Sequence, residues 1–239
     1  MNPNFFFSTF LCLLCLLNSS LSHASALIKV EGGVIHVISR FVYSGPALTD
    51  EIAEASTREI RKMWNEQIHF VEFEGKPHRV VFDIDYTLDN PRNLQNADSC
   101  AYNYVDVRDR EDAGSRSVYY LGGNNGIFYT SDNLGHSSTV AHEYGHGLGL
   151  EHNEGYQEDA EVPGIMFARG TLVKSKFRYN PKAVSGDQGG TLNPVFRKVR
   201  KEDVRQIDFN QVYLTHNFLP WMPRYGCLGS GRPEKISGH

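Results

Sequence analysis

A short segment in the middle of the chain gathers side chains that could do chemistry. It reads His-Glu-Tyr-Gly-His-Gly-Leu-Gly-Leu-Glu-His and covers residues 142–152. His142 and His146 are four residues apart, so on a helix they project from one face and can bind one tetrahedral metal ion. Gly149 permits a chain reversal with positive φ, which would return His152 as a third ligand. Three nitrogen ligands leave one position of a Zn²⁺ ion open, which is typical of a catalytic site.

The carboxylate inside the same segment predicts hydrolysis. Glu143 follows the first histidine, where it can reach a zinc-bound water without being a ligand itself. Zinc would lower the pKa of that water toward ~7, which produces a usable nucleophile near neutral pH. Glu143 would accept the proton while the water attacks a peptide carbonyl. The segment therefore predicts one catalytic Zn²⁺, Glu143 as general base and a protein or peptide substrate; the alternative is an amphipathic helix with surface histidines.

The segment resembles the signature of the metzincin zinc endopeptidases, His-Glu-x-x-His-x-x-Gly-x-x-His, at every fixed position. Gly145 and the run 148–150 (Leu-Gly-Leu) are most similar to the matrixin and adamalysin branches. The resemblance implies a methionine turn beneath the metal, for which Met166 within Pro-Gly-Ile-Met-Phe (163–167) is the candidate. The alternative for Met166 is an ordinary core methionine. Ala168 stands where astacins and serralysins carry a tyrosine, so no tyrosine ligand is expected there.

The elements around this segment predict an α+β fold. The resemblance implies a metzincin-like architecture: a twisted, mostly parallel sheet, an active-site helix and a smaller irregular C-terminal subdomain. Patterns of branched and aromatic residues predict strands at 34–43, 69–73, 79–88, 102–107, 117–121 and 127–130. Helices are expected at 48–66, with Thr49 as N-cap, at 139–150, capped by Ser137 or Ser138, and at about 201–213. By resemblance, Ile127 to Thr130 is the edge strand that pairs with an extended substrate.

The start of the chain predicts export. The apolar block Phe5 to Leu17, followed by small residues, reads as a secretory signal peptide covering residues 1–26, with cleavage after Ala24 or Ala26. The alternative, an uncleaved membrane anchor, needs a longer block. Residues 27–239 are then expected to form a single metzincin-like catalytic domain, with an N-terminal subdomain to about 152 and a C-terminal subdomain from about 153. The protein is expected to be secreted or periplasmic, with no stable membrane association after cleavage.

Cysteine usage agrees with export. Removing the leader takes away Cys12 and Cys15 and leaves Cys100 and Cys227. An isolated pair in an exported protein most simply forms one disulfide, and two free buried thiols are the alternative.

The charge distribution gives weaker signals. A net charge of −4 offers no reason to expect nucleic acid as a partner. An acidic cluster follows the histidines and consists of Glu151, Glu154, Glu158, Asp159 and Glu161. One hypothesis is that this cluster binds Ca²⁺ or favours basic substrates; ordinary solvated charge is the alternative.

Three other interpretations of the histidine segment stay open. Glu158 or Glu161 could replace His152 as third ligand, as in thermolysin-like enzymes. The protein could be a secreted zinc-binding module without catalysis, although a purely structural site has no use for Glu143. It could also be a toxin-type peptidase with one narrow protein target.

Overall fold

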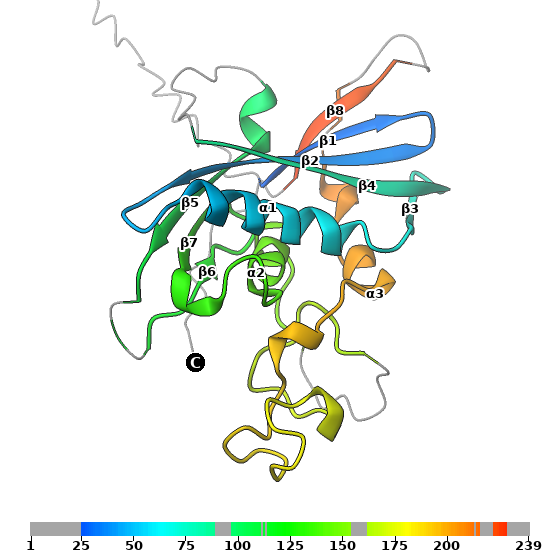
Figure 1. Cartoon of the computed structure of the whole chain (residues 1–239). Coiled ribbons are helices and arrows are strands. Elements are labelled where there is room, and N and C mark those ends of the chain that lie inside the picture. The colour runs from blue at the N-terminus through cyan, green and yellow to red at the C-terminus, as the bar shows by residue number, and fades with distance from the viewer. Residues whose placement is uncertain are drawn as a thin grey trace, which may run out of the picture.

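The computed structural model describes residues 25–88, 97–110, 112, 114–153, 162–212, 214–215 and 222–228. Within them the chain forms one mixed, mostly parallel sheet and three α-helices (Figure 1). The strands are β1 (Ala26–Glu31), β2 (Val34–Ser44), β3 (His69–Phe73), β4 (Lys76–Thr87), β5 (Tyr102–Arg108), β6 (Val118–Tyr119), β7 (Asn125–Tyr129) and β8 (Arg224–Leu228). The helices are α1 (Asp50–Trp64), α2 (Thr139–Gly147) and α3 (Lys201–Arg205). The α+β class predicted from the sequence is confirmed.

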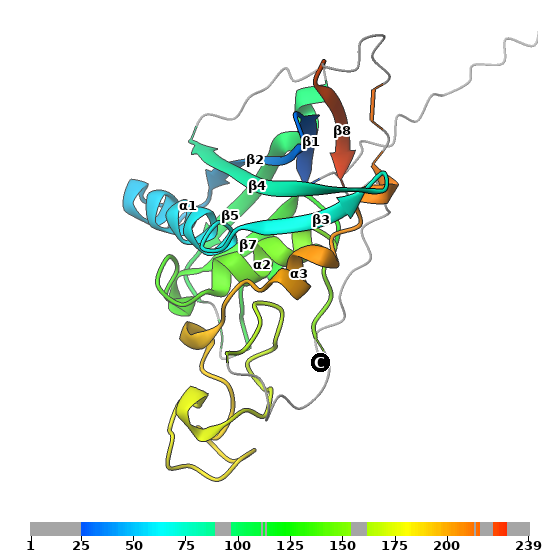
Figure 2. The ribbon, with the colours of Figure 1, turned by 90° about the vertical axis from the view of Figure 1, so that its right-hand side faces the viewer.

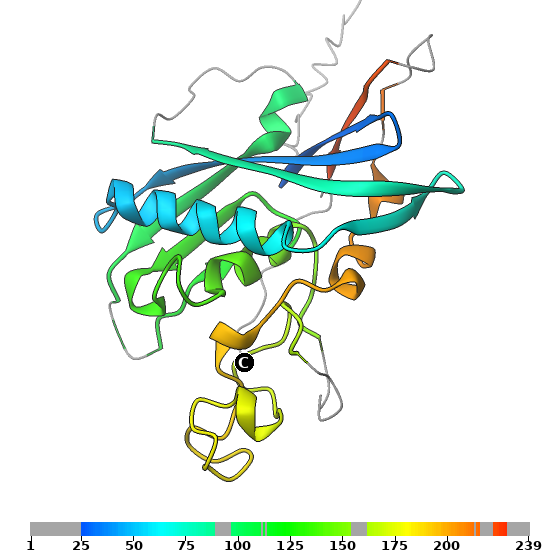
Figure 3. The ribbon, with the colours of Figure 1, turned by 45° about the vertical axis from the view of Figure 1, so that its right-hand side comes forward.

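The sheet has a parallel centre and antiparallel margins. Its strands follow the order β3-β4-β2-β5-β7-β6. β2 runs parallel to β4 and β5, and β5 runs parallel to β7, whereas the β3–β4 and β6–β7 pairs are antiparallel. β1 pairs with the first half of β2 and β8 pairs with β1, both antiparallel. Because β1 and β8 pair in this way, the sheet curls over β2 (Figure 3).

The helices that position the site cover one face of the sheet. α1 and α2 lie on the same side of it, and α3 lies below the β3 margin (Figures 1 and 2). Residues on that face of β2, such as Ile35, Val37 and Phe41, are fully buried and alternate with partly exposed ones. This period of two presents an apolar surface on which the helices pack.

Local sequence explains the bounds of α1. The Thr49 side chain accepts a hydrogen bond from the Ile52 backbone N–H at 3.2 Å, as expected of an N-cap. Ala53, Ile60 and Trp64 are fully buried along one stripe of the helix. Trp64 also donates from Nε1 to the Ala141 carbonyl at 3.0 Å, which joins the end of α1 to the helix that carries the histidines.

α2 is shorter than predicted. It ends at Gly147 rather than near Leu150, because Gly149 adopts φ = +88° and turns the chain away from the helix axis. The N–H of Leu150 then bonds to the carbonyl of Gly145 at 3.0 Å, which closes the helix terminus. Ser138 precedes the helix with φ = +64° and its side chain forms no N-cap bond, whereas Ser137 Oγ accepts the Thr139 backbone N–H at 3.3 Å, as an N-cap does.

Two expectations, one about the sheet and one about the last helix, need correction. The strand 127–130 corresponds to β7, which pairs with β5 along its length and with β6 at Gly126 and Ile127, so it is not the outermost strand. β6 is the outermost strand, since order in a sheet is decided by tertiary pairing rather than by position in the chain. The final helix stops at Arg205 and is followed by a 3₁₀ turn at Phe209–Gln211, while Tyr213 lies outside the described residues.

The predicted disulfide is confirmed. Cys100, in a 3₁₀ turn before β5, bonds to Cys227 in β8, with their Cα atoms 5.5 Å apart. A disulfide of this kind is typical of proteins outside the cytoplasm. No helix in the described ranges has the length and apolar character needed to cross a membrane.

The described chain begins close to the predicted end of the leader. Residues 1–24 of the predicted leader lie outside the described residues. Ser25 and Ala26 already belong to the fold. The Ser25 carbonyl accepts hydrogen bonds from Ser39 Oγ at 3.0 Å and Asn103 Nδ2 at 2.9 Å, and Ala26 pairs with Leu228. Of the two cleavage positions, the one after Ala24 keeps these contacts.

Candidate metal centre

The three histidines predicted as metal ligands lie together. His152 Nε2 is 3.1 Å from His142 Nε2 and 3.2 Å from His146 Nε2. Two nitrogens on one tetrahedral zinc ion, each at about 2.0–2.1 Å from it, would be roughly 3.3 Å apart. His142 and His146 are buried within α2, whereas His152 is exposed after the turn at Gly149. The donor set and its spacing therefore suit a metal ion.

Hydrogen bonds on the far side of two rings fix which nitrogen carries the proton. His142 Nδ1 lies 2.6 Å from the Ile165 carbonyl oxygen and His146 Nδ1 lies 2.7 Å from the Leu150 carbonyl oxygen. A carbonyl only accepts, so each Nδ1 must donate its N–H and each Nε2 presents a lone pair. One N–H on His152 could not satisfy both of these lone pairs at once. One cation bound by the Nε2 atoms of all three rings would satisfy all of these lone pairs.

Burial favours the neutral state that metal binding requires. It lowers the pKa of His146 to about 4 and that of His142 well below its usual range, and the neighbouring charges of Arg197 and the other histidines act in the same direction. Burial also lowers the pKa of His152, which is more accessible. A neutral imidazole is the ligand form, so the site needs little deprotonation at neutral pH.

Glu143 is buried beside the histidines, at 7% exposure. Burial raises the pKa of its carboxyl to about 8, while Arg197 and the backbone amide of Tyr119 act to lower it. Tyr144, the next residue, points into the core instead. Its hydroxyl lies 2.8 Å from Ser39 Oγ and its ring packs edge-on against Trp64.

Met166 lies directly under α2. A Cβ atom added to Gly145 would come within 2.4 Å of Met166 Sδ, so the glycine is what allows the thioether to approach the helix. Met166 is fully buried, and the preceding carbonyl, that of Ile165, is the partner of His142. The segment 163–167 thus supports the first histidine from below.

Two acidic residues that the sequence did not single out hold this arrangement in place. Glu59 of α1 is nearly buried and accepts the backbone N–H groups of Ser137 at 3.2 Å and Ala141 at 3.3 Å, so it caps α2 from a different helix. Asp203 of α3 is fully buried and accepts from Asn153 Nδ2 at 3.3 Å and from the Arg200 N–H at 2.8 Å. Asp203 therefore anchors the residue that follows His152.

A buried arginine also escaped the sequence analysis. Arg197 is 2% exposed, and its Nε has no hydrogen-bond partner among the described residues. Burial lowers the pKa of its guanidinium to about 10, and the charge of Glu143 is the largest influence in the opposite direction. In the sequence, Arg197 lies among other lysines and arginines, and nothing there indicated that it alone would be buried.

Other histidines and acidic residues lie elsewhere or outside the described chain. His69 is in β3, His78 is in β4 and His136 is exposed before α2, so the structure does not bring them to the triad. Residues 154–161 and His216 lie outside the described residues, and with them Glu158, Glu161 and most of the acidic cluster. The hypotheses of a glutamate ligand and of a calcium site stay predictions.

Comparison with known proteins identifies no family. No family model matches the chain, and no curated protein has significant similarity to it. Among solved structures, a chain described as part of a chaperone–substrate complex is similar over 72% of this chain, at 15% identity and a TM-score of 0.37. The similarity covers 34% of that chain. A likeness of this size supports no inference about fold or activity.

Proposed function

We propose that this protein is an exported zinc-dependent endopeptidase. The observation that carries the proposal is the convergence of three imidazole Nε2 atoms, two with their tautomers set by backbone carbonyls, next to the buried carboxylate of Glu143. The chemistry supplied by a zinc ion when bound there is Lewis-acid activation of a water molecule and of the scissile carbonyl. The resemblance of residues 142–152 to the metzincin signature supports the same assignment.

The chain's own residues would carry the proton transfers. The charge of a bound Zn²⁺ would favour the ionised form of Glu143 and so oppose the effect of burial on its pKa. Glu143 would then accept the proton of the attacking water and deliver it to the leaving amine, so the two transfers balance over one turnover. Because the Glu143 carboxyl is surrounded by protein, bulk water competes less for hydrogen bonds to it. A closed structural metal site would gain nothing from such a group, which favours catalysis over a purely metal-binding role.

Strand β6 offers a place for the substrate main chain. It is the last strand of the sheet, next to α2, and Val118 is 37% exposed on it. An extended peptide could add to this edge by backbone hydrogen bonds. This moves the substrate-binding edge from the 127–130 strand expected from the sequence to β6.

The decisive experiment combines metal analysis with cleavage of a peptide library by the exported form. Wild type is expected to carry one zinc per chain and to cleave, and a chelator should abolish cleavage. Glu143→Ala should keep the zinc and lose nearly all turnover, whereas Glu54→Ala, an exposed glutamate on α1, should behave as wild type. A broad library is preferable to casein, since a peptidase with one narrow target could spare casein. Retained turnover in Glu143→Ala, or zinc binding without any cleavage, would contradict the proposal.

A further inference from the structure

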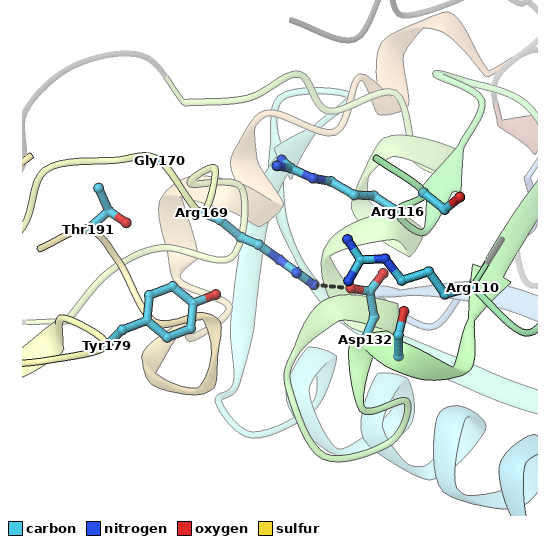
Figure 4. A pocket seen from close by; sticks show the side chains of 9 residues that line it. Arg110, Arg116, Asp132, Arg169, Gly170, Tyr179 and Thr191 are labelled. Carbon is cyan, nitrogen blue, oxygen red and sulfur yellow. Dashed lines mark hydrogen bonds and ion pairs between the residues drawn. The ribbon is translucent and has the colours of Figure 1, made fainter. Parts of the chain in front are cut away.

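A polar cavity lies near the start of α2, where one of its lining residues, Arg169, bonds to Thr139. Its volume is about 400 Å³, and the residues that line it come from the segment before β6, the 3₁₀ turn Thr130–Asp132, and the chain after Met166. In Figure 4 the side chains of Arg110 and Arg169 reach toward the carboxylate of Asp132, and that of Arg116 extends away from it. We call this cavity the arginine pocket.

The arginine pocket carries excess positive charge among its described lining residues. Arg110, Arg116 and Arg169 line it together with one carboxylate, that of Asp132, and Arg110 Nε already donates to the Asp112 carbonyl at 2.6 Å. Both oxygens of Asp132 already have partners, since Oδ1 accepts from Arg169 at 2.8 Å and Oδ2 accepts the Ser117 backbone N–H at 2.8 Å. Arg116 is exposed and makes no ion pair within the described part of the chain. The pocket can therefore accept a further anion.

The pocket is linked to the helix of the proposed catalytic residues through Arg169. Arg169 Nη2 also bonds to Oγ1 of Thr139, the first residue of α2, at 3.1 Å, and Glu143 follows one turn later on that helix. The charges of Glu143 and of Arg169 and Tyr179, which line the pocket, all influence the buried Arg197. The Arg197 guanidinium is nearly inaccessible and its Nε has no partner among the described residues, so negative charge near it is favourable.

We infer that the arginine pocket recognises a carboxylate of the polypeptide substrate close to the scissile bond. The inference rests on the proposed peptidase function and names its substrate class. Guanidinium groups bind carboxylates through paired, charge-assisted hydrogen bonds, and a concave site strengthens them by excluding water. The carboxylate could belong to a Glu or Asp side chain or to the free C-terminus of the peptide. This preference is the reverse of the basic one suggested by the acidic cluster after the histidines.

The test uses pairs of peptides that differ only in charge. Each position near the cleaved bond carries Glu or its neutral isostere Gln, and each peptide ends in a free acid or an amide. At one position Glu should be preferred about tenfold or more in kcat/KM, the size expected for a charge-assisted contact. Arg116→Ala should reduce that ratio several-fold, while Arg58→Ala, an exposed arginine on α1, should leave it unchanged. A preference that follows the acid end rather than the Glu residue would assign the pocket to the C-terminus.

Binding separates this inference from the proposed function. Fluorescence anisotropy with Glu143→Ala measures affinity for the same labelled peptides without turnover. Tighter binding of the charged peptide, weakened by salt and by Arg116→Ala, supports the pocket even if wild type cleaves nothing. Cleavage with equal Glu and Gln rates and equal affinities, for peptides with free or amidated ends, would overturn the inference and leave the peptidase assignment standing.

Discussion

The Glu59 carboxylate, which belongs to α1, accepts the backbone N–H of Ala141 in the first turn of α2 at 3.3 Å. It also accepts the N–H of Ser137 at 3.2 Å, although 78 positions separate the two residues in sequence. The first turn of a helix exposes N–H groups that carry partial positive charge, and an acidic side chain is a favourable partner for them. His142 comes directly after Ala141, so Glu59 holds the start of the helix that presents the first ligand.

The burial of Glu59 at this place predicts a specific pH dependence of stability. Burial raises the pKa of the Glu59 carboxyl from 4.5 to about 6, which corresponds to about 2 kcal/mol. Because the folded state favours the protonated form, this contribution is fully present below about pH 4.5 and is lost as the pH rises through 6. The free energy of unfolding of wild type relative to Glu59→Gln should therefore fall by about 2 kcal/mol between about pH 4 and pH 7. Denaturant titrations at each pH measure the difference; Glu54→Gln is the control, and a flat difference for Glu59→Gln would refute the prediction.

Metal removal should lower stability through the histidine site. A ligand that binds only the folded state contributes about 4 kcal/mol when its free concentration is a thousandfold above Kd. Chelation should therefore lower the Tm of zinc-loaded wild type. In His146→Ala and His152→Ala the chelator should have little effect, because both have lost a ligand. His136→Ala, which changes an exposed histidine outside the triad, should respond as wild type does; a similar chelator response in all variants would place the metal elsewhere.

The close approach of Gly145 and Met166 predicts a packing effect. In Gly145→Ala the new Cβ would lie 2.4 Å from Met166 Sδ, so the thioether must move within a fully buried environment. Overpacking of this kind costs about 1–3 kcal/mol, partly offset by about 1 kcal/mol from the better helix propensity of alanine. The same change in a Met166→Ala background should cost less, since the obstacle is gone. A double-mutant cycle by denaturant unfolding measures this coupling, and additive costs would argue against the contact.

The disulfide should stabilise the pairing of β8 with β1. Cys227 lies opposite Leu27 in that pairing, and the bond closes a loop across 127 positions. Loop-closure entropy gives about 4–5 kcal/mol for a loop of that length. The Cys100→Ala/Cys227→Ala variant should lose a comparable free energy of unfolding and should lose amide protection first in β8, as measured by hydrogen exchange. Unchanged protection of β8 would mean that main-chain pairing alone holds the strand.

Local patterns explain what could be predicted. The spacing of His142, His146 and His152 around a glycine is a property of consecutive residues, and helix geometry translates it directly into a shared face. The N-cap at Thr49 and most strand bounds depend on similarly short-range preferences. The pairing of Cys100 with Cys227 followed from counting, since two cysteines remain once the leader is set aside.

Tertiary structure alone decided the surroundings of those residues. Glu59, Asp203 and Arg197 come from segments distant in sequence from the histidines, and each looks like an ordinary charged residue until folding removes it from water. The same applies to the outermost strand of the sheet, because a strand's neighbours depend on the order of the whole sheet. The sequence by itself determined which atoms could bind a metal. The tertiary structure decided what holds those atoms and which charges face them, through the packing of α1, α3 and the chain after Met166 against α2. Burial and long-range pairing are not encoded in any local window of the sequence.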